Sequence, residues 1–227
     1  MGEAILDEDV ILIRSHIVTY GKATTPHLNR RICTEIEQMW NEPNAAVSIR
    51  NKLYRVRFHI TGISLPQLTE LEVLQNTDPG ANFFRIEDFV KGNISFVDGL
   101  GCNSGYFLLE NLYEGSTTAA HEYGHTLGLK HPVNMDIRGL GVPGIMYPRG
   151  TLVDAIYQYD PKKQAGTTGG TMHPMHRKVR QEDVEDLKLH KLEYRNSRAI
   201  LGEFTNIYHW DHADEPGDGF RKPSIFG

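Results

Sequence analysis

Hydrophobic residues gather in short segments through the first half of the chain, and most of these segments are rich in Val, Ile and aromatic residues. Segments of that length and composition, bounded by turn residues, are typical of β-strands. Residues 50–52 separate two of them and predict a hairpin or a tight crossover. Residues 61–91 carry mixed loop and short-helix signals. The predicted strands cover residues 10–20, 45–49, 53–60, 93–97 and 105–109.

A helical period replaces this pattern in residues 26–41, where apolar residues recur every three or four positions. Thr25 can cap the first turn, and Pro26 suits the first helical position because its fixed φ matches a helix. The segment therefore predicts an amphipathic helix. Its apolar positions are Leu28, Ile32, Ile36, Met39 and Trp40.

The second half of the chain has fewer apolar runs. Residues 149–180 are rich in Gly, Pro, Thr and His and predict a long connection. A helix is predicted from Gln181 to about Leu192, because acidic residues cluster where a helix N-terminus favours negative charge. Residues 193–227 are expected to form a tail that packs on the preceding domain or extends from it.

Residues 121–131 have the form H-E-x-x-H-x-x-G-x-x-H. On a helix, His121 and His125 project from one face and can hold one metal ion together. Gly128 can adopt a left-handed conformation that ends the helix and turns the chain, so that His131 can supply a third ligand. Ser116 or Thr117 precedes this helix and is expected to cap it.

Zinc suits this set of ligands, because it binds neutral imidazole nitrogen tetrahedrally. Three protein ligands leave a fourth position open for water, as in catalytic rather than structural zinc sites. Glu122 follows the first ligand directly and is placed to accept a proton from that water. The added glycine and third histidine make this pattern much more specific than H-E-x-x-H alone. Three incidental histidines on an ordinary amphipathic helix are the less favoured interpretation.

These residues resemble the metzincin clan of zinc peptidases. The clan also carries a methionine in a tight turn beneath the zinc, and residues 144–148, Gly-Ile-Met-Tyr-Pro, match that methionine turn with Met146. The sequence of this turn is close to the matrixin version, and residues 111–113 are also matrixin-like. Matrixins usually have serine after the third histidine, where this chain has Pro132.

The resemblance implies an α+β, metzincin-type zincin fold. It implies a twisted, mixed, five-stranded sheet with an active-site helix, the methionine turn and a C-terminal helix. Residues 1–192 would form the catalytic domain, with an upper part that ends at about His131 and a lower part from residue 132. The two parts would face each other across a cleft within one domain.

The resemblance also implies roles for residues around the zinc. Met146 would form an apolar floor beneath the imidazoles and would not bind the metal. Residues 94–97 would be a sheet edge on which an extended substrate adds as an antiparallel strand, unless both sides of that strand are already paired. The chain after Met146 would form one wall of the pocket for the substrate side chain just past the scissile bond. The candidate substrate contacts are Ile94, Ser95, Phe96, Val97, Tyr147 and Pro148.

The long connection starts at this expected pocket wall. Long loops in compact domains are often functional, so it is expected to shape the pocket. The alternative is that its apolar residues only attach the loop to the core. The residues concerned are Leu152, Val153, Ile156 and Tyr157.

Two further histidine groups raise the question of a second metal. His173 and His176 lie in the long connection, and His209, Asp211 and His212 lie in the tail. Exposed loop histidines and a solvated tail are the favoured interpretations of both.

The 227 residues, 39% hydrophobic and 23% charged, are ordinary for one soluble domain, and a monomer is expected. The net charge of −5 argues against nucleic acid or an anionic membrane as a partner. No apolar run approaches the ~18 residues of a membrane helix, and no signal peptide is visible. Cys33 and Cys102 favour two isolated thiols over one bridge. A secreted location follows only from the clan resemblance.

Together these features predict a zinc-dependent endopeptidase that acts on proteins or peptides with one catalytic Zn²⁺. A non-catalytic zinc-binding module, or a decayed peptidase that only binds partners, is disfavoured by the intact Glu122. A third alternative keeps the chemistry and makes the chain a toxin-like effector domain of a larger secreted protein.

Overall fold

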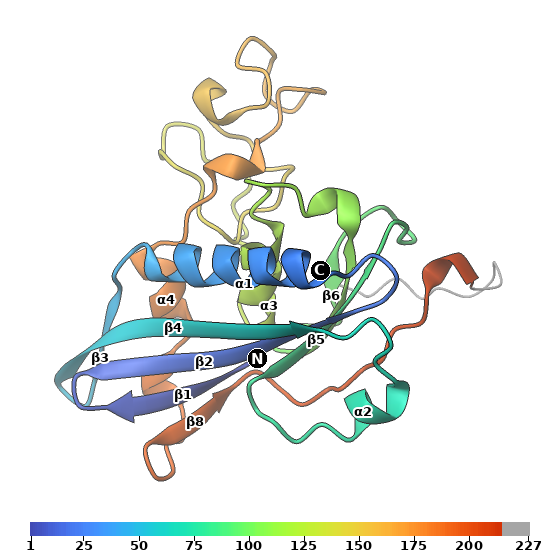
Figure 1. Ribbon diagram of the computed structural model, residues 1–227. Helices are drawn as coiled ribbons and strands as arrows, with labels where there is room; N and C mark the ends of the chain where they lie inside the picture. Colours follow the sequence, from blue (N-terminus) through green and yellow to red (C-terminus); the bar gives the residue numbers. More distant parts are fainter. Residues whose placement is uncertain (215–227) are drawn as a thin grey trace.

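The computed structural model describes residues 1–214. Eight strands form one mixed, curled sheet, in the order β3-β4-β2-β5-β7-β6, with β1 pairing β2 and β8 (Figure 1). Strands β2, β4, β5 and β7 run parallel to one another, and the remaining pairs are antiparallel. The strands are β1 Gly2–Asp7, β2 Val10–Tyr20, β3 Ala46–Ile49, β4 Lys52–Ser64, β5 Ala81–Glu87, β6 Phe96–Val97, β7 Ser104–Leu108 and β8 Arg198–Leu201.

The α+β class is confirmed, and the prediction of five strands is wrong. Strand β5 was not recognised, although all of its residues are buried, because Asn82, Arg85 and Glu87 interrupt its apolar pattern. Strands β1 and β8 lie at the two ends of the chain, where no strand was predicted. The predicted strand 93–97 is only Phe96–Val97.

The predicted helix 26–41 is confirmed as α1, Pro26–Asn41. Its first turn is capped as expected, because the Thr25 hydroxyl accepts a hydrogen bond from the Leu28 N–H at 3.1 Å. The predicted hairpin is confirmed as well: β3 and β4 are antiparallel, and Arg50 and Asn51 both have positive φ between them.

The other helices are short. The helix predicted over 181–192 ends early, because Lys188 adopts a left-handed φ of 53° that an α-helix cannot continue. No described helix is long and apolar enough to cross a bilayer. These helices are α2 Glu70–Leu74, α3 Thr118–Thr126 and α4 Gln181–Asp186, and the 3-10 turns are Leu109–Asn111, Ala155–Tyr157, Pro174–His176, Leu189–Lys191 and His212–Asp214.

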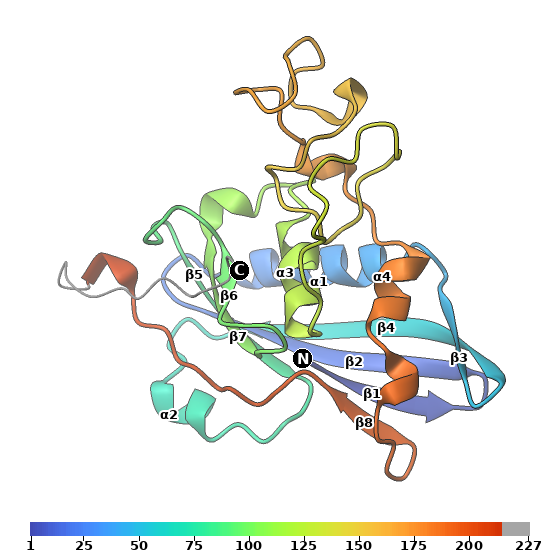
Figure 2. The same cartoon turned by 180° about the vertical axis from the view of Figure 1, so that it is seen from behind.

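Helices α1 and α3 lie on one face of the sheet, whereas α2 lies on the other side (Figures 1 and 2). Trp40 of α1 contacts both the sheet and α3. Its ring packs against Phe58 of β4 and Tyr123 of α3, with ring centroids 5.2 and 5.8 Å away. Its indole N–H also donates to the Ala120 carbonyl at 3.1 Å, so the position of α3 depends on α1.

Residues 132–180 form a lobe of loops above α1, as the two views show. The predicted long connection over 149–180 is therefore confirmed. The lobe has its own small apolar core of Ile137, Val153 and Met172, with Tyr147 and Tyr157 packed against it.

The chain after β8 crosses the sheet beside β5 and β7 (Figure 2). It is anchored at Asn103, whose fully buried side-chain oxygen accepts hydrogen bonds from the N–H groups of Thr205 at 3.1 Å and Asn206 at 2.8 Å. Residues 215–227 of the predicted tail lie outside the described residues. Cys33 and Cys102 are both free thiols, as predicted.

Asn103→Ala should reduce the free energy of unfolding by about 2–3 kcal/mol, because it leaves buried backbone groups without hydrogen-bond partners. Urea denaturation measures this change. Asn134→Ala is the matched control, since Asn134 is exposed and its side chain accepts only from the nearby Asp136 N–H. Equal, small losses in both variants would contradict the anchoring role of Asn103.

Candidate metal centre

Helix α3 and the turn after it bring three histidines together. His121 and His125 lie one turn apart on α3, which ends at Thr126 with Leu127 as its C-cap. Gly128 has a φ of +94°, as predicted, and the Leu129 N–H donates back to the Gly124 carbonyl at 3.0 Å. This pair of features is a Schellman motif, and it reverses the chain so that His131 returns to the helix.

The imidazole nitrogens converge as metal ligands do. Nε2 of His131 lies 3.1 Å from Nε2 of His121 and 3.1 Å from Nε2 of His125. Nitrogens bound tetrahedrally to zinc at about 2.0–2.1 Å lie about 3.3 Å from one another. Among the described residues, these three form the one cluster whose ligand atoms could hold a metal ion.

Backbone carbonyls decide which nitrogen faces the metal site. Nδ1 of His121 donates to the Ile145 carbonyl at 2.7 Å, and Nδ1 of His125 donates to the Leu129 carbonyl at 2.8 Å. Since a carbonyl only accepts, both protons sit on Nδ1, and both Nε2 atoms present lone pairs. His131 has at most one Nε2 proton and cannot form linear hydrogen bonds to both, so a metal ion fits this arrangement.

The same rings are held in the uncharged form that binds metal. Burial lowers the pKa of His121 well below its usual range and lowers the pKa of His125 to about 4. Burial also lowers the pKa of His131, and the positive charge of Arg177 adds to this effect. Metal binding at neutral pH therefore requires no loss of a proton from these rings.

Glu122 lies beside the three histidines and is 8% exposed. Burial raises the pKa of its carboxyl group to about 8, while the positive charges of Arg177 and Arg149 act in the opposite direction. A carboxyl group with a pKa this close to neutrality can both accept and release a proton.

The methionine turn lies directly against α3. The Tyr147 N–H donates to the Gly144 carbonyl at 3.2 Å and closes the turn, and Met146 is 3% exposed. A Cβ atom at Gly124 would overlap the Met146 sulfur, so only glycine lets the two segments approach this closely. Because the Ile145 carbonyl accepts a hydrogen bond from His121, the turn also fixes the orientation of this ring.

Of the two residues predicted to cap the N-terminus of α3, Ser116 makes a hydrogen bond to the first turn and Thr117 does not. Thr117 occupies the cap position, but its φ is 54° and its side chain makes no cap hydrogen bond. The Ser116 hydroxyl accepts from the Thr118 N–H at 3.3 Å. A carboxylate oxygen of Glu35, on α1, accepts from the Ala120 N–H at 3.2 Å and supplies the further capping contact.

A cavity of about 260 Å³ opens onto the three histidines and Glu122. Four of the candidate substrate contacts lie along one wall, and Pro148 lies on another. Tyr147 is not among the lining residues and packs in the loop lobe. The lining residues are Asn93, Ile94, Ser95, Phe96, Val97, Asn111, Thr118, His121, Glu122, His125, His131, Pro148, Arg149 and Arg177.

Strand β6, within residues 94–97, is an edge of the described sheet. It pairs only with β7, through Phe96 with Tyr106 and Val97 with Gly105. The hydroxyl of Ser95 accepts from the Leu108 N–H at 3.1 Å and fixes the chain just before the strand. The outer side of β6 therefore has no partner strand among residues 1–214.

The four apolar residues expected to shape the pocket do not line it. Val153 and Tyr157 belong to the core of the loop lobe, and Ile156 is 67% exposed. Leu152 exchanges backbone hydrogen bonds with Met135 and Ile137. Leu152, Val153 and Tyr157 pack or pair within the lobe, which agrees with the alternative interpretation, whereas Ile156 is exposed and does neither.

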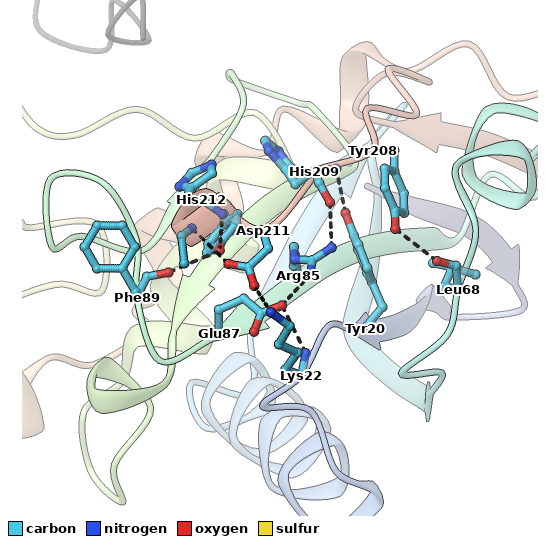
Figure 3. Close-up of polar contacts among 12 residues, drawn as sticks. Tyr20, Lys22, Leu68, Arg85, Glu87, Phe89, Tyr208, His209, Asp211 and His212 are labelled. Carbon is cyan, nitrogen blue, oxygen red and sulfur yellow. Dashed lines mark hydrogen bonds and ion pairs between the residues drawn. The ribbon is translucent and has the colours of Figure 1, made fainter. Parts of the chain in front are cut away.

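Neither of the two further histidine groups forms a metal cluster in the described residues. His209 instead pairs with Asp98, Nε2 to Oδ1 at 2.8 Å, and Asp211 pairs with Lys22 at 2.5 Å (Figure 3). His173 stacks near Tyr159, with ring centroids 4.3 Å apart. His209 and Asp211 attach the C-terminal segment to the chain after β6 and after β2, so the interpretation of a solvated tail was wrong for these residues, whereas the contact of His173 with Tyr159 lies within the loop lobe.

Sequence reasoning missed three charged residues at the site: Glu35, Arg149 and Arg177. Arg149 lies within residues 148–150, where the pocket wall was expected, but its charge was given no role. Glu35 and Arg177 gave no local signal, since their partners are distant in the chain.

No protein-family model and no curated protein matches this chain. Among solved structures, a structure of myroilysin is similar, with 14% sequence identity and a TM-score of 0.29. The match covers 57% of this chain and 54% of the other, so it spans about half of the myroilysin chain. A TM-score this low carries no argument about function, and the chemistry of the site has to follow from its own geometry.

Gly124→Ala should weaken zinc binding by about tenfold or more, because the added methyl group displaces Met146 and the turn that holds His121. Competition with a chromogenic chelator measures the zinc affinity. Gly150→Ala is the control, since a Cβ there meets no atom within 4 Å. Wild-type zinc affinity in Gly124→Ala would show that the turn does not position the ligands.

Proposed function

We propose that this protein is a zinc-dependent endopeptidase. The observation that carries the proposal is the convergence of three neutral imidazole Nε2 atoms beside a buried carboxyl group, in a cavity open to solvent. A purely structural zinc site is closed by four protein ligands, whereas the three histidines here would leave one position of a bound zinc ion for water or substrate. The metzincin resemblance of residues 121–131 and 144–148 supports the same chemistry.

His121, His125 and His131 would hold the zinc ion. When bound, zinc supplies Lewis-acid activation of a water molecule and stabilises negative charge that develops on the scissile carbonyl oxygen. Glu122 accepts a proton from the water on its carboxylate and passes that proton to the leaving amide nitrogen. The pKa of about 8 belongs to the metal-free site, and a neighbouring cation favours the carboxylate that this first step needs.

The edge strand would align the substrate. The Asp98 N–H donates to the Ser104 carbonyl at 3.1 Å, which makes these two residues a hydrogen-bonded antiparallel pair. Because such pairs alternate along a strand, Val97 and Ser95 direct their backbone groups away from β7. An extended peptide can bind these groups in a strand-like conformation and pass over the histidines.

The purified protein should bind about one zinc ion per chain and cleave peptides, and a chelator should abolish the cleavage until zinc is restored. Glu122→Gln should retain zinc and lose most of the activity, by about 100-fold or more, because it removes the base and no ligand. His125→Ala should lose both the zinc ion and the activity. Elemental analysis and a peptide-cleavage assay test this, and near-normal turnover in Glu122→Gln would exclude Glu122 as the base.

N-methylation of successive amides in a good peptide substrate should reduce kcat/KM in an alternating pattern. Only every second substrate N–H would point at the β6 edge, and methylation removes that donor. The neighbouring amides, methylated one at a time, are the internal controls. Uniform losses, or none, would argue against strand-like docking on residues 94–97.

A further inference from the structure

Two arginines line the same cavity as the zinc ligands, and the proposed chemistry assigns them no role. Arg149 directly follows the methionine turn, and Arg177 directly follows the 3-10 turn Pro174–His176. Both guanidinium groups are close enough to Glu122 to act on its carboxyl group electrostatically. The positive charge of Arg149 also repels that of Arg177 and lowers the pKa of Arg177. The cavity therefore holds two cations of the protein itself.

Arg177 is rigidly held with neutral partners. It is 3% exposed, and its guanidinium donates to the Thr117 hydroxyl at 2.8 Å, the Ser116 carbonyl at 3.1 Å and the Tyr147 carbonyl at 3.2 Å. These contacts use three of its five N–H groups. No carboxylate of the described residues forms an ion pair with it. Glu122 and Glu35 favour its positive charge electrostatically without forming an ion pair with it, and its two remaining N–H groups can serve an anionic ligand.

Arg149 is half-buried and more loosely held. Its two side-chain hydrogen bonds go to the Asn111 amide oxygen and the Thr118 hydroxyl, each at 3.3 Å. These distances are at the long end of the normal range, and both acceptors are neutral. An anionic ligand in the cavity offers a stronger, charge-assisted partner, and the planar guanidinium suits a carboxylate in particular.

We propose that Arg149 and Arg177 form a subsite for a carboxylate, so that the enzyme prefers substrates with an aspartate or glutamate side chain next to the scissile bond. The inference rests on the proposed peptidase function. The same chemistry would also accept the terminal carboxylate of a peptide, which the experiment distinguishes. Within the cavity, Glu122 is the one acidic lining residue, and it is engaged in proton transfer.

The test begins with a cleavage-site screen of the zinc-loaded protein on a diverse peptide mixture. The best site is then made as four peptides, with Glu or Gln at the adjoining position, and with a free or an amidated C-terminus. Each is assayed with wild type, Arg149→Gln, Arg149→Lys and Arg138→Gln. Arg138 is the matched control, because it is exposed, pairs with Asp136 at 2.5 Å and does not line the cavity.

Wild type should cleave the Glu peptide at least about tenfold better than the Gln peptide, as kcat/KM. Arg149→Gln should reduce this ratio to about threefold or less, Arg149→Lys should retain part of it, and Arg138→Gln should leave it unchanged. If Arg149→Gln slows both peptides equally, Arg149 acts on the reaction and not on a substrate carboxylate, and the proposal is overturned. Cleavage without an acid preference overturns it too.

The comparison of peptides with free and amidated C-termini decides whether the bound carboxylate is a side chain or the end of the peptide. Cleavage only near the chain end, abolished by amidation, supports the subsite but assigns it to the terminal carboxylate. If no peptide in the screen is cleaved, the peptidase function fails, and binding of labelled Glu and Gln versions of one peptide from the mixture to zinc-loaded Glu122→Gln, measured by fluorescence anisotropy, still tests the subsite. Equal affinity for Glu and Gln peptides would overturn it.

Discussion

The metal site depends on two backbone carbonyls that hold the imidazole rings. The carbonyls of Leu129 and Ile145 accept hydrogen bonds from the Nδ1–H groups of His125 and His121, and so turn both Nε2 lone pairs inward. Leu129 belongs to the turn after α3, whereas Ile145 belongs to the methionine turn. A histidine ring can rotate and change tautomer unless its second nitrogen is fixed. The convergence with His131 therefore requires both turns to be in place before any metal binds.

The helix that carries two of the ligands is too short to be stable alone, because isolated helices of its nine residues are marginal in water. Tertiary contacts supply its stability. Trp40 and Glu35 of α1 bind the Ala120 carbonyl and N–H. Arg177 ties the loop before the helix to the methionine turn. The three histidines, the methionine turn and α1 thus support one another beside the cavity.

The sheet edge beside this cavity, strand β6, is also stabilised by residues that are distant in the sequence. Strand β6 has only two residues, and pairing with β7 alone gives it little stability. The C-terminal segment adds to it: Phe96 packs edge-on against His209 and stacks on His212, with ring centroids 5.6 and 6.3 Å away. His209 is held in turn by Asp98, which directly follows the strand. One edge of β6 can then face the cavity while its side chains are anchored behind it.

The sequence by itself determined the features that depend on neighbours in the chain. Thr25, Pro26 and an apolar 3.6-residue period specify α1, and Gly128 specifies the reversal that returns His131, because caps and periodicity act within a few residues. Only the tertiary structure decided features that join distant segments. It placed Glu35 on the N-terminus of α3, where only local capping by Ser116 or Thr117 had been expected, and it buried Arg177 in the cavity. It likewise made a central strand of residues 81–87, whose polar side chains find partners far along the chain.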